Sequence, residues 1–472
     1  MKHKFLHKEN TGRLILIFAG WSTEADFYKE VSAEGFDVLV VWDYSNPEFD
    51  MNLIEGYDTV ILIAWSLGVY AASRYLPPCN VTSAIAVNGT ECPVSDLYGI
   101  PSDVFKGTME NLDERNLLKF RKRMTGKSFG ALMERFSSAP VGDLKRELKA
   151  ILDSCVKPDD VSTVVEGETP EKNCHYIRWD RIYLSTDDRI FPYRNQKRWW
   201  EKRGYADSII EIGGDHYVDL PRLVASLFPS RRKVATRFSR ALPTYDDNAG
   251  AQRKIALMLA DFIRRQGVGK IGKILEIGGG SGLFSRIMGE MFNPSEATFI
   301  DLYPVPKLGI APDERYIVAD AEEWVEEEAS GNTGAYDAVV SASAMQWFID
   351  PERFIVNAGR LLKPGGFLGV STFLPGNLKE LMPVNPFGLL YLPADRLETM
   401  FRNHFRNVRI EHTSIEMKFL SSRELLRHLK LTGVGGEGGA GVTLREMLST
   451  LPDRLTYYPA FIFASEFKKS IN

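Results

Sequence analysis

The sequence contains few cysteines and no long hydrophobic run. Its four cysteines form no CxxC pair and no other metal-ligand spacing, so we predict reduced thiols and no metal site. No segment reaches the ~20 apolar residues that a membrane-spanning helix requires. The N-terminal stretch MKHKFLHKENTGR is polar and charged, unlike a signal peptide. These absences predict a cytoplasmic protein that does not enter a membrane.

An excess of charge of either sign is also missing. The 58 lysines and arginines nearly balance the 62 aspartates and glutamates, and the formal net charge is −4. Such a balance argues against nucleic acid or an anionic membrane as a partner. The chain has 472 residues, of which 44% are hydrophobic, enough for two or three domains with buried cores.

Short apolar runs rich in Val, Ile and Leu occur in both halves of the chain. The runs at 14–21 and 59–68 lie in the first half, and KILEIGGGSG at 273–282 lies in the second. Such runs, when they alternate with helical stretches, predict parallel sheets with helices on both faces. The sequence therefore predicts an α/β protein with two such domains.

A change of pattern marks the boundary between these domains. Residues 219–228 predict the closing helix of the first domain, and the basic stretch 229–240 predicts a short linker. We therefore place the domains at 1–229 and 230–472. Helical patterns at about 103–170 interrupt the first domain, where we expect a helical cap over its active site.

Ser66 stands in the sequence AWSLG, directly between an apolar strand and a helical stretch. In this setting a tight turn exposes a nucleophilic hydroxyl group. Asp188 and His216 follow later, each in a loop after a strand-like stretch. The order serine, acid, histidine is that of α/β-hydrolases, so we predict His216 as the general base and Asp188 as its partner. Asp187 and Asp215 remain alternative acids.

An ester hydrolase also needs donors for the negative charge that develops on the ester oxygen. We predict the backbone N–H groups of Trp21 and of Leu67, which follows the nucleophile. Ala64 replaces the usual first glycine of the motif and is small enough for the turn. The first half is therefore predicted to have an α/β-hydrolase fold and to be a serine esterase or acyl hydrolase.

Longer segments of the first half resemble a known family. FAGWSTEADFY, AWSLGVYAA and above all AVNGTECPVSDLYGIP (86–101) resemble the BioG-type pimeloyl-acyl-carrier-protein methyl ester esterases of biotin synthesis. The resemblance covers about residues 10–225. It implies a substrate with a methyl ester at one end and an acyl carrier protein at the other.

The second half contains a glycine-rich turn, EIGGGSG, between a strand and a helix, where the backbone can pass close to a nucleoside cofactor. Asp301 ends the next strand, where its carboxylate can accept hydrogen bonds from both ribose hydroxyls. In IVADAEEW, two acids flank a small alanine where an adenine would lie. The predicted cofactor-binding residues are Glu276, Gly278, Gly280, Gly282, Asp301, Asp320, Ala321 and Glu322.

A glycine-rich turn alone also fits nicotinamide enzymes. The Lys-Pro-Gly-Gly turn in LLKPGGFLGV (361–370) instead favours a class I, Rossmann-like methyltransferase with S-adenosylmethionine as its cofactor. RFSRALPTYDDNAGAQRKIA (237–256) and RELLRHLKLTGV (423–434) further resemble BioC-type malonyl-acyl-carrier-protein methyltransferases. This resemblance spans about 235–465. The predicted substrate-lining residues are Tyr245, Gln346 and Trp347.

Together the resemblances imply one pathway, in which malonyl-carrier protein is methylated and the methyl group is removed after elongation to pimeloyl length. The esterase must then spare the malonyl ester, so we expect the cap to select by chain length. Basic clusters at 121–127, 145–149, 194–198 and 423–430 are candidate docking surfaces for the acidic carrier protein.

Two alternative functions stay open from the sequence. One is a general carboxylesterase or thioesterase fused to a small-molecule or quinone methyltransferase. The other is that one half is catalytically inactive and only docks the carrier protein. The complete serine–acid–histidine order and the unbroken glycine turn argue against an inactive half.

Overall fold

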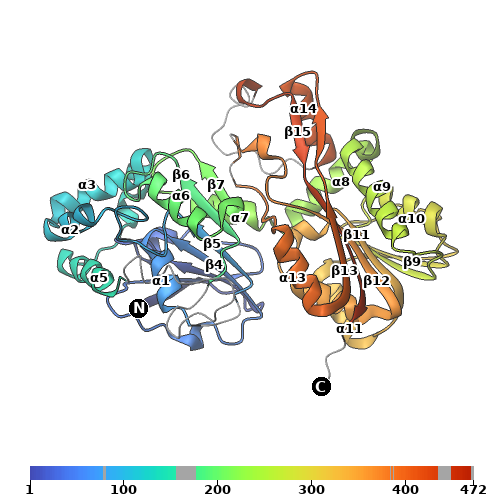
Figure 1. Cartoon of the computed structure of the whole chain (residues 1–472), viewed down its shortest axis with the longest axis horizontal. Coiled ribbons are helices and arrows are strands. Elements are labelled where there is room, and N and C mark those ends of the chain that lie inside the picture. Colours follow the sequence, from blue (N-terminus) through green and yellow to red (C-terminus); the bar gives the residue numbers. More distant parts are fainter. Residues whose placement is uncertain (78–80, 156–176, 383, 386, 434–447, 469–472) are drawn as a thin grey trace. The chain divides into compact units, whose positions relative to one another are not determined.

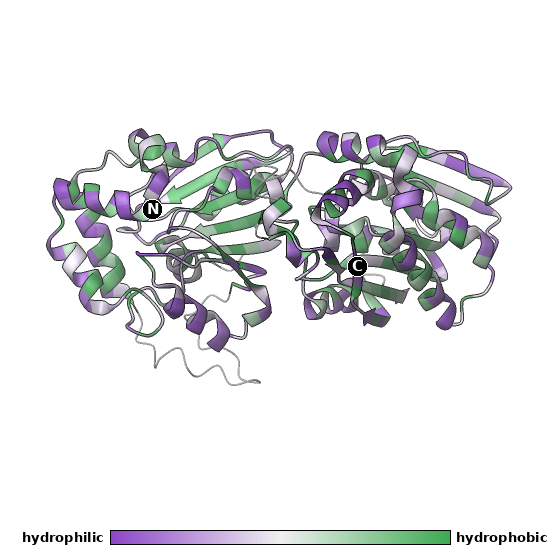
Figure 2. Cartoon of the chain, turned by 90° about the horizontal axis from the view of Figure 1, so that it is seen from above, coloured by the Kyte–Doolittle hydropathy of each residue, from purple (hydrophilic) through white to green (hydrophobic). Residues whose placement is uncertain are grey.

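The computed structural model describes residues 1–77, 81–155, 177–382, 384–385, 387–433 and 448–468. The chain divides into two compact units, Met1–Ala225 and Ser226–Asn472. Each unit is an α/β fold around a mixed seven-stranded sheet (Figure 1), so the predicted α/β class is confirmed. Figure 2 shows that the strands are mainly hydrophobic and that the helices carry hydrophilic faces. Within these described ranges, no helix is long and apolar enough to cross a bilayer.

The sheet of the first unit has the strand order β1-β3-β2-β4-β5-β6-β7, and only the β1–β3 pair is antiparallel. Every residue of β4 and β5 is buried, which explains their continuous apolar sequences. The strands are β1 (Lys2–His7), β2 (Arg13–Phe18), β3 (Asp37–Trp42), β4 (Thr59–Trp65), β5 (Ser83–Val87), β6 (Arg181–Ser185) and β7 (Ile209–Ile212).

Among the residues described between β5 and β6, four α-helices lie in the region predicted as a cap. Figure 1 shows α2, α3 and α5 gathered at one side of this sheet. The remaining part of the predicted cap, from residue 156 onward, lies outside the described residues. The helices of the unit are α1 (Leu67–Tyr75), α2 (Ser102–Glu110), α3 (Glu114–Thr125), α4 (Phe129–Leu132), α5 (Val141–Ser154), α6 (Tyr193–Lys202) and α7 (Leu220–Leu227).

The sheet of the second unit has the order β10-β9-β8-β11-β12-β16-β13. The first five strands are parallel, and β16 runs antiparallel to both of its neighbours. This confirms the predicted Rossmann-like fold. The strands are β8 (Lys273–Ile277), β9 (Glu296–Asp301), β10 (Asp313–Val318), β11 (Tyr336–Ala342), β12 (Leu362–Phe373), β13 (Phe405–His412) and β16 (Pro459–Phe467), with a separate pair β14 (Ile415–Lys418) and β15 (Arg454–Tyr457).

Helix α8 corrects one expectation from the sequence. The stretch predicted as a linker is helical from Arg231 onward, and the Ser230 hydroxyl caps the helix by accepting the Lys233 N–H at 3.2 Å. The basic stretch is therefore the first helix of the second unit. The helices of this unit are α8 (Arg231–Asn248), α9 (Gly250–Arg265), α10 (Leu283–Phe292), α11 (Ala321–Gly331), α12 (Pro351–Leu361), α13 (Ala394–His404) and α14 (Ser422–Thr432).

Candidate active sites

Ser66 occupies the turn between β4 and α1 with φ 59° and ψ −127°. This conformation is rare for a residue with a side chain and is held by tight local packing. A Cβ atom on Gly68 would lie 2.2 Å from the Phe18 carbonyl oxygen, so only glycine fits there. Ala64, which replaces the usual glycine, is fully buried without disturbing the turn.

His216 joins Ser66 to Asp188. Its Nε2 lies 2.8 Å from the Ser66 hydroxyl oxygen, and its Nδ1 lies 2.7 Å from Asp188 Oδ2. All three residues are buried, and His216 is completely shielded from solvent. The structure thus brings the three predicted residues into one hydrogen-bonded chain, although they are far apart in the sequence.

Asp188, rather than either alternative acid, contacts the histidine. Its Oδ1 accepts the backbone N–H groups of Ile190 and Phe191 at 2.8 Å, and Gln196 Nε2 donates to its Oδ2 at 3.1 Å. These donors fix the direction of the Asp188 carboxyl group. Asp187 is exposed, and Asp215 lies against Gly126.

The backbone carbonyl of His216 is held by two side chains. Trp65 Nε1 donates to it at 3.1 Å, and Asn88 Nδ2 donates at 2.8 Å. Asn88 also receives the Ser185 N–H at 2.7 Å, so it ties the histidine loop to the end of β6. Reasoning from the sequence missed Asn88, although it lies in the NGT segment that carries the family resemblance.

Cap helices contact residues next to this hydrogen-bonded chain. Trp21 Nε1 donates to the Leu144 carbonyl at 3.0 Å, and the Trp21 ring meets Phe120 edge-on with centroids 4.8 Å apart. Trp21 and Leu67, the predicted oxyanion donors, are both 3% exposed. Arg121 donates to the Ser137 carbonyl at 2.8 Å and to Ser22 at 3.4 Å, so it joins the cap to the loop after β2 and is a poor docking charge.

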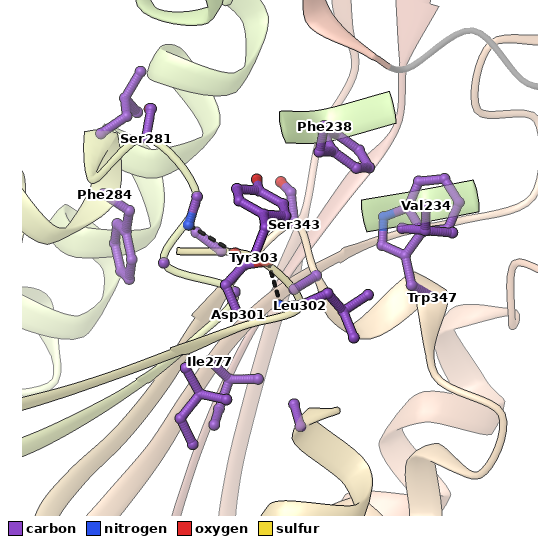
Figure 3. Close-up of a pocket in the computed structure, with 18 of the residues that line it drawn as sticks. Val234, Phe238, Ile277, Ser281, Phe284, Asp301, Leu302, Tyr303, Ser343 and Trp347 are labelled. Carbon is purple, nitrogen blue, oxygen red and sulfur yellow. Dashed lines mark hydrogen bonds between the residues drawn. The ribbon is translucent and has the colours of Figure 1, made fainter. Parts of the chain in front are cut away.

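A pocket in the second unit is formed at the carboxyl ends of the parallel strands (Figure 3). Figure 3 shows Asp301 and Tyr303 between Ser281 and Phe284 on one side and Val234 and Trp347 on the other. Of the predicted residues, the pocket is lined by Gly278, Gly280, Asp301, Asp320, Ala321, Tyr245 and Trp347.

Four predicted residues do not line this pocket: Glu276, Gly282, Glu322 and Gln346. Glu276 is 1% exposed, and burial raises the pKa of its carboxyl group to about 8. The Gln346 amide donates to the Ser343 carbonyl at 2.5 Å. The sequence did not single out Arg231, Phe238 or Tyr303, which do line the pocket.

Asp301 lies at the end of β9 and faces the glycine turn. Its Oδ2 accepts the Gly280 N–H at 2.8 Å, and its Oδ1 accepts the Leu302 N–H at 2.7 Å. Burial raises the pKa of this carboxyl group to about 6, while the backbone donors act in the opposite direction. The carboxylate is therefore a strong acceptor at the centre of the pocket.

Arg231 binds two acids at the other end of the pocket. Its Nε lies 2.6 Å from Asp320, and its Nη2 contacts Glu322. Its Nη1 also donates to the Trp347 carbonyl at 2.6 Å. Burial raises the pKa of Glu322, and the charge of Arg231 opposes this shift. Glu322 therefore supports the pocket wall instead of lining it.

The glycine turn fits a cofactor that passes close to the backbone. Gly278 has φ +76°, and a Cβ atom there would lie 2.6 Å from the Ala344 Cβ. Any larger residue would displace this wall of the pocket. The acceptors Asp301 and Asp320 then match the hydroxyl and amino donors of an adenosine group. Within the described residues, no group of three potential metal ligands occurs.

Comparisons with known proteins match both halves. The family described as pimeloyl-ACP methyl esterase BioG matches residues 1–224, and a methyltransferase domain family matches residues 230–434. A malonyl-[acyl-carrier protein] O-methyltransferase of Bacteroides fragilis is 31% identical over 96% of this chain and 92% of that protein. One of Porphyromonas gingivalis is 36% identical over 43% of this chain and 77% of that protein. The crystal structure of BioG from Haemophilus influenzae is 35% identical and covers 46% of this chain and 94% of its own, with a TM-score of 0.40.

Proposed function

Because the chain belongs to the family of malonyl-[acyl-carrier protein] O-methyltransferases and carries a BioG domain before its methyltransferase domain, we propose that it catalyses two reactions. Residues 230–472 methylate the free carboxylate of malonyl-acyl-carrier protein. Residues 1–229 hydrolyse the methyl ester of pimeloyl-acyl-carrier protein. The observation that carries this proposal is that each half has its own assembled site.

The first half acts as a serine esterase with an α/β-hydrolase fold. Ser66 Oγ attacks the ester carbonyl carbon while His216 Nε2 accepts the serine proton. The same proton is returned to the departing methoxide, so methanol leaves and an acyl-serine remains. Water then attacks the acyl-serine with His216 again as the base, and the free carboxylate is released. The 2.8 Å and 2.7 Å contacts of His216 support these roles.

Two further groups support this chemistry. Asp188 holds the Nδ1 proton of His216 and stabilises the imidazolium that forms. The backbone N–H groups of Trp21 and Leu67 stabilise the oxyanion, because Leu67 follows Ser66 at the start of α1 and Trp21 follows β2, the neighbour of β4, at the same edge of the sheet. We expect the cap contact between Trp21 and Phe120 to restrict which acyl chains reach the serine.

The cofactor of the second half is S-adenosylmethionine, as for the methyltransferase domain family that residues 230–434 match. When bound, it supplies an electrophilic methyl group on a sulfonium. Asp301 accepts hydrogen bonds from the ribose, and Asp320 and Ala321 lie beside the adenine. Tyr245 and Trp347 shield the reacting region from water. A carboxylate substrate is already nucleophilic at neutral pH, so the protein mainly positions the reactants.

Both reactions change the charge at the end of the acyl chain. Methylation removes the negative charge of the malonyl carboxylate, which an apolar elongation pocket would otherwise have to desolvate. Hydrolysis of the ester after elongation restores that charge. The esterase therefore has to act on the long chain and spare the short one.

The test follows the mass of intact carrier protein. We expect the purified enzyme with S-adenosylmethionine to add one methyl group to malonyl-carrier protein and to remove one from pimeloyl-carrier protein methyl ester. Ser66→Ala should abolish only the removal. If this variant leaves malonyl-carrier protein unmethylated, the methyltransferase assignment fails; if the wild type also leaves pimeloyl ester intact, the esterase assignment fails.

A further inference from the structure

The loop after β2, residues 19–23, lies against the turn that carries Ser66. A Cβ atom on Gly68 would lie 2.8 Å from the Ala19 carbonyl oxygen, so the two backbones are in contact there. Within the part of the chain that the structure describes, the backbone N–H of Trp21 donates to no acceptor, although only 3% of this residue is exposed. Buried N–H groups nearly always have an acceptor, so a free one in this loop fits a donor to the oxyanion.

The direction of the Trp21 N–H is set through the Gly20 carbonyl. These two groups belong to one planar trans peptide unit, so they point in opposite directions. The Gly20 carbonyl accepts the Thr23 hydroxyl at 2.6 Å and the Thr23 N–H at 3.3 Å. Thr23 therefore fixes the plane of the peptide that carries the proposed oxyanion donor.

The cap holds this part of the loop in place. Thr23 forms an antiparallel β-bridge with Phe136 of the cap. Beside it, the Ser137 N–H donates to the Ser22 carbonyl at 3.2 Å. Ser22 is 1% exposed and has a φ of +65°, which a residue with a side chain rarely adopts. Surrounding contacts have to maintain such a conformation, and the bridge to the cap supplies some of them.

Arg121 of α3 contacts both sides of this bridge. Its Nη2 donates to the Ser137 carbonyl at 2.8 Å and to the Ser22 carbonyl at 3.4 Å, and its Nε donates to the Ser22 hydroxyl oxygen at 3.4 Å. Its guanidinium also lies 4.8 Å from the centre of the Phe136 ring. We propose that Arg121 is a positioning residue, which holds the cap against the loop and so keeps the Trp21 N–H directed at the oxyanion. This inference rests on the proposed esterase reaction, and it makes the rate of that reaction depend on the cap.

The test measures esterase kinetics of the full-length protein on two substrates, p-nitrophenyl acetate and pimeloyl-carrier protein methyl ester. The first needs no docking of a carrier protein, and both need the oxyanion donors. We expect Arg121→Met to lower kcat about tenfold to a hundredfold on both esters and to leave KM within about twofold. Arg121→Lys should restore part of this loss, because lysine still donates but lacks the planar fork. Arg115→Met, at an exposed position of the same helix, is the matched control.

Labelling of Ser66 to completion with a fluorophosphonate counts the folded active sites, and so separates positioning from unfolding. A fall in kcat that only follows the labelled fraction would overturn the proposal, as would an unchanged kcat. A loss confined to KM for the carrier-bound ester would also overturn it, because Arg121 would then dock the carrier protein.

A second variant tests the same route without changing the charge of the cap. Thr23→Val removes the hydroxyl that holds the Gly20 carbonyl and should lower kcat on both esters in the same way. The double variant with Arg121→Met should lose little more than the stronger single variant, because both act on one peptide unit. If the wild type hydrolyses neither ester, the esterase function itself fails, and this inference fails with it.

Discussion

The guanidinium Nε of Arg231 lies 2.6 Å from the carboxylate of Asp320, 89 residues later in the chain. Arg231 is the first residue of α8, and Asp320 directly precedes α11. This ion pair therefore ties the leading helix of the second unit to the proposed adenine side of the pocket. The same guanidinium also contacts Glu322, so one cation balances two partly buried acids.

We expect Arg231→Ala to weaken S-adenosylhomocysteine binding several-fold and to destabilise the second unit. Loss of charged hydrogen bonds of this kind costs about 1.5–3 kcal/mol, because the carboxylates remain buried without their cation. Calorimetric binding and thermal unfolding measure the two effects. Arg232→Ala, at an exposed neighbouring position, should change neither quantity. If Arg231→Ala and Arg232→Ala bind S-adenosylhomocysteine and unfold alike, Arg231 does not stabilise the pocket.

Asp188→Asn should lower the esterase turnover by roughly 10⁴-fold, because an amide stabilises the wrong tautomer of His216. The measurement is the rate of methanol release from pimeloyl-carrier protein methyl ester. Asp187→Asn and Asp215→Asn serve as matched controls and should keep most of the activity. Methyl transfer to malonyl-carrier protein should be unchanged in all three variants. A large loss in either control would show that another acid acts with His216.

Glu147 predicts a pH-dependent stability of the cap. Burial raises the pKa of its carboxyl group to about 8, although the backbone N–H of Tyr44 opposes the shift. Between about pH 5 and 8 the folded state holds a proton that the unfolded state has released, so stability falls as pH rises. Above about pH 8, the pKa of Glu147 in the folded state, this contribution to stability is lost completely.

Glu147→Gln should therefore unfold at a higher temperature than the wild type at about pH 8–9. The difference should shrink toward pH 5, because the wild-type carboxyl group is then neutral in the folded state. Thermal unfolding at several pH values measures this difference directly. Glu134→Gln, at an exposed position of the same region, should follow the wild type at every pH. If the unfolding temperatures of Glu147→Gln and the wild type differ by the same amount at every pH, Glu147 does not titrate in this range.

Phe120→Ala should weaken the chain-length selection of the esterase. The Phe120 ring packs edge-on against Trp21, whose backbone N–H is a proposed oxyanion donor. Removing the ring leaves space in the cap against Trp21, so malonyl methyl ester should gain about tenfold in kcat/KM relative to the pimeloyl ester. Leu118→Ala lies on the exposed side of the same helix and should leave the ratio unchanged.

Local turn chemistry made much of both sites predictable. The strand–turn–helix settings of Ser66 and of the glycine turn depend on residues adjacent in sequence, and the structure has both turns. The order of serine, acid and histidine along the chain could also be recognised from the sequence. The sequence favoured Asp188 as the acid but left Asp187 open, because these neighbours differ only in the direction of their side chains, and it left Asp215 open as well.

Contacts across long sequence separations could not be predicted in the same way. Arg231 was placed in a linker because the basic stretch 229–240 interrupts the apolar pattern, and its two acidic partners lie in a different region of the sequence. His428 was interpreted as a docking charge, yet it is 7% exposed and bonded to Tyr457. Here a signal existed, since Leu425, His428 and Leu429 share the helical spacing of a buried face.

At Ser66, the backbone conformation favours glycine for stability, whereas the reaction requires serine. Side-chain-bearing residues at such angles are strained by roughly 1–3 kcal/mol, whereas glycine adopts them freely. A single change to glycine would relax the turn and delete the nucleophile at once. Laboratory evolution toward heat resistance alone would therefore reward loss of the esterase, and every round of such a campaign has to screen for turnover as well.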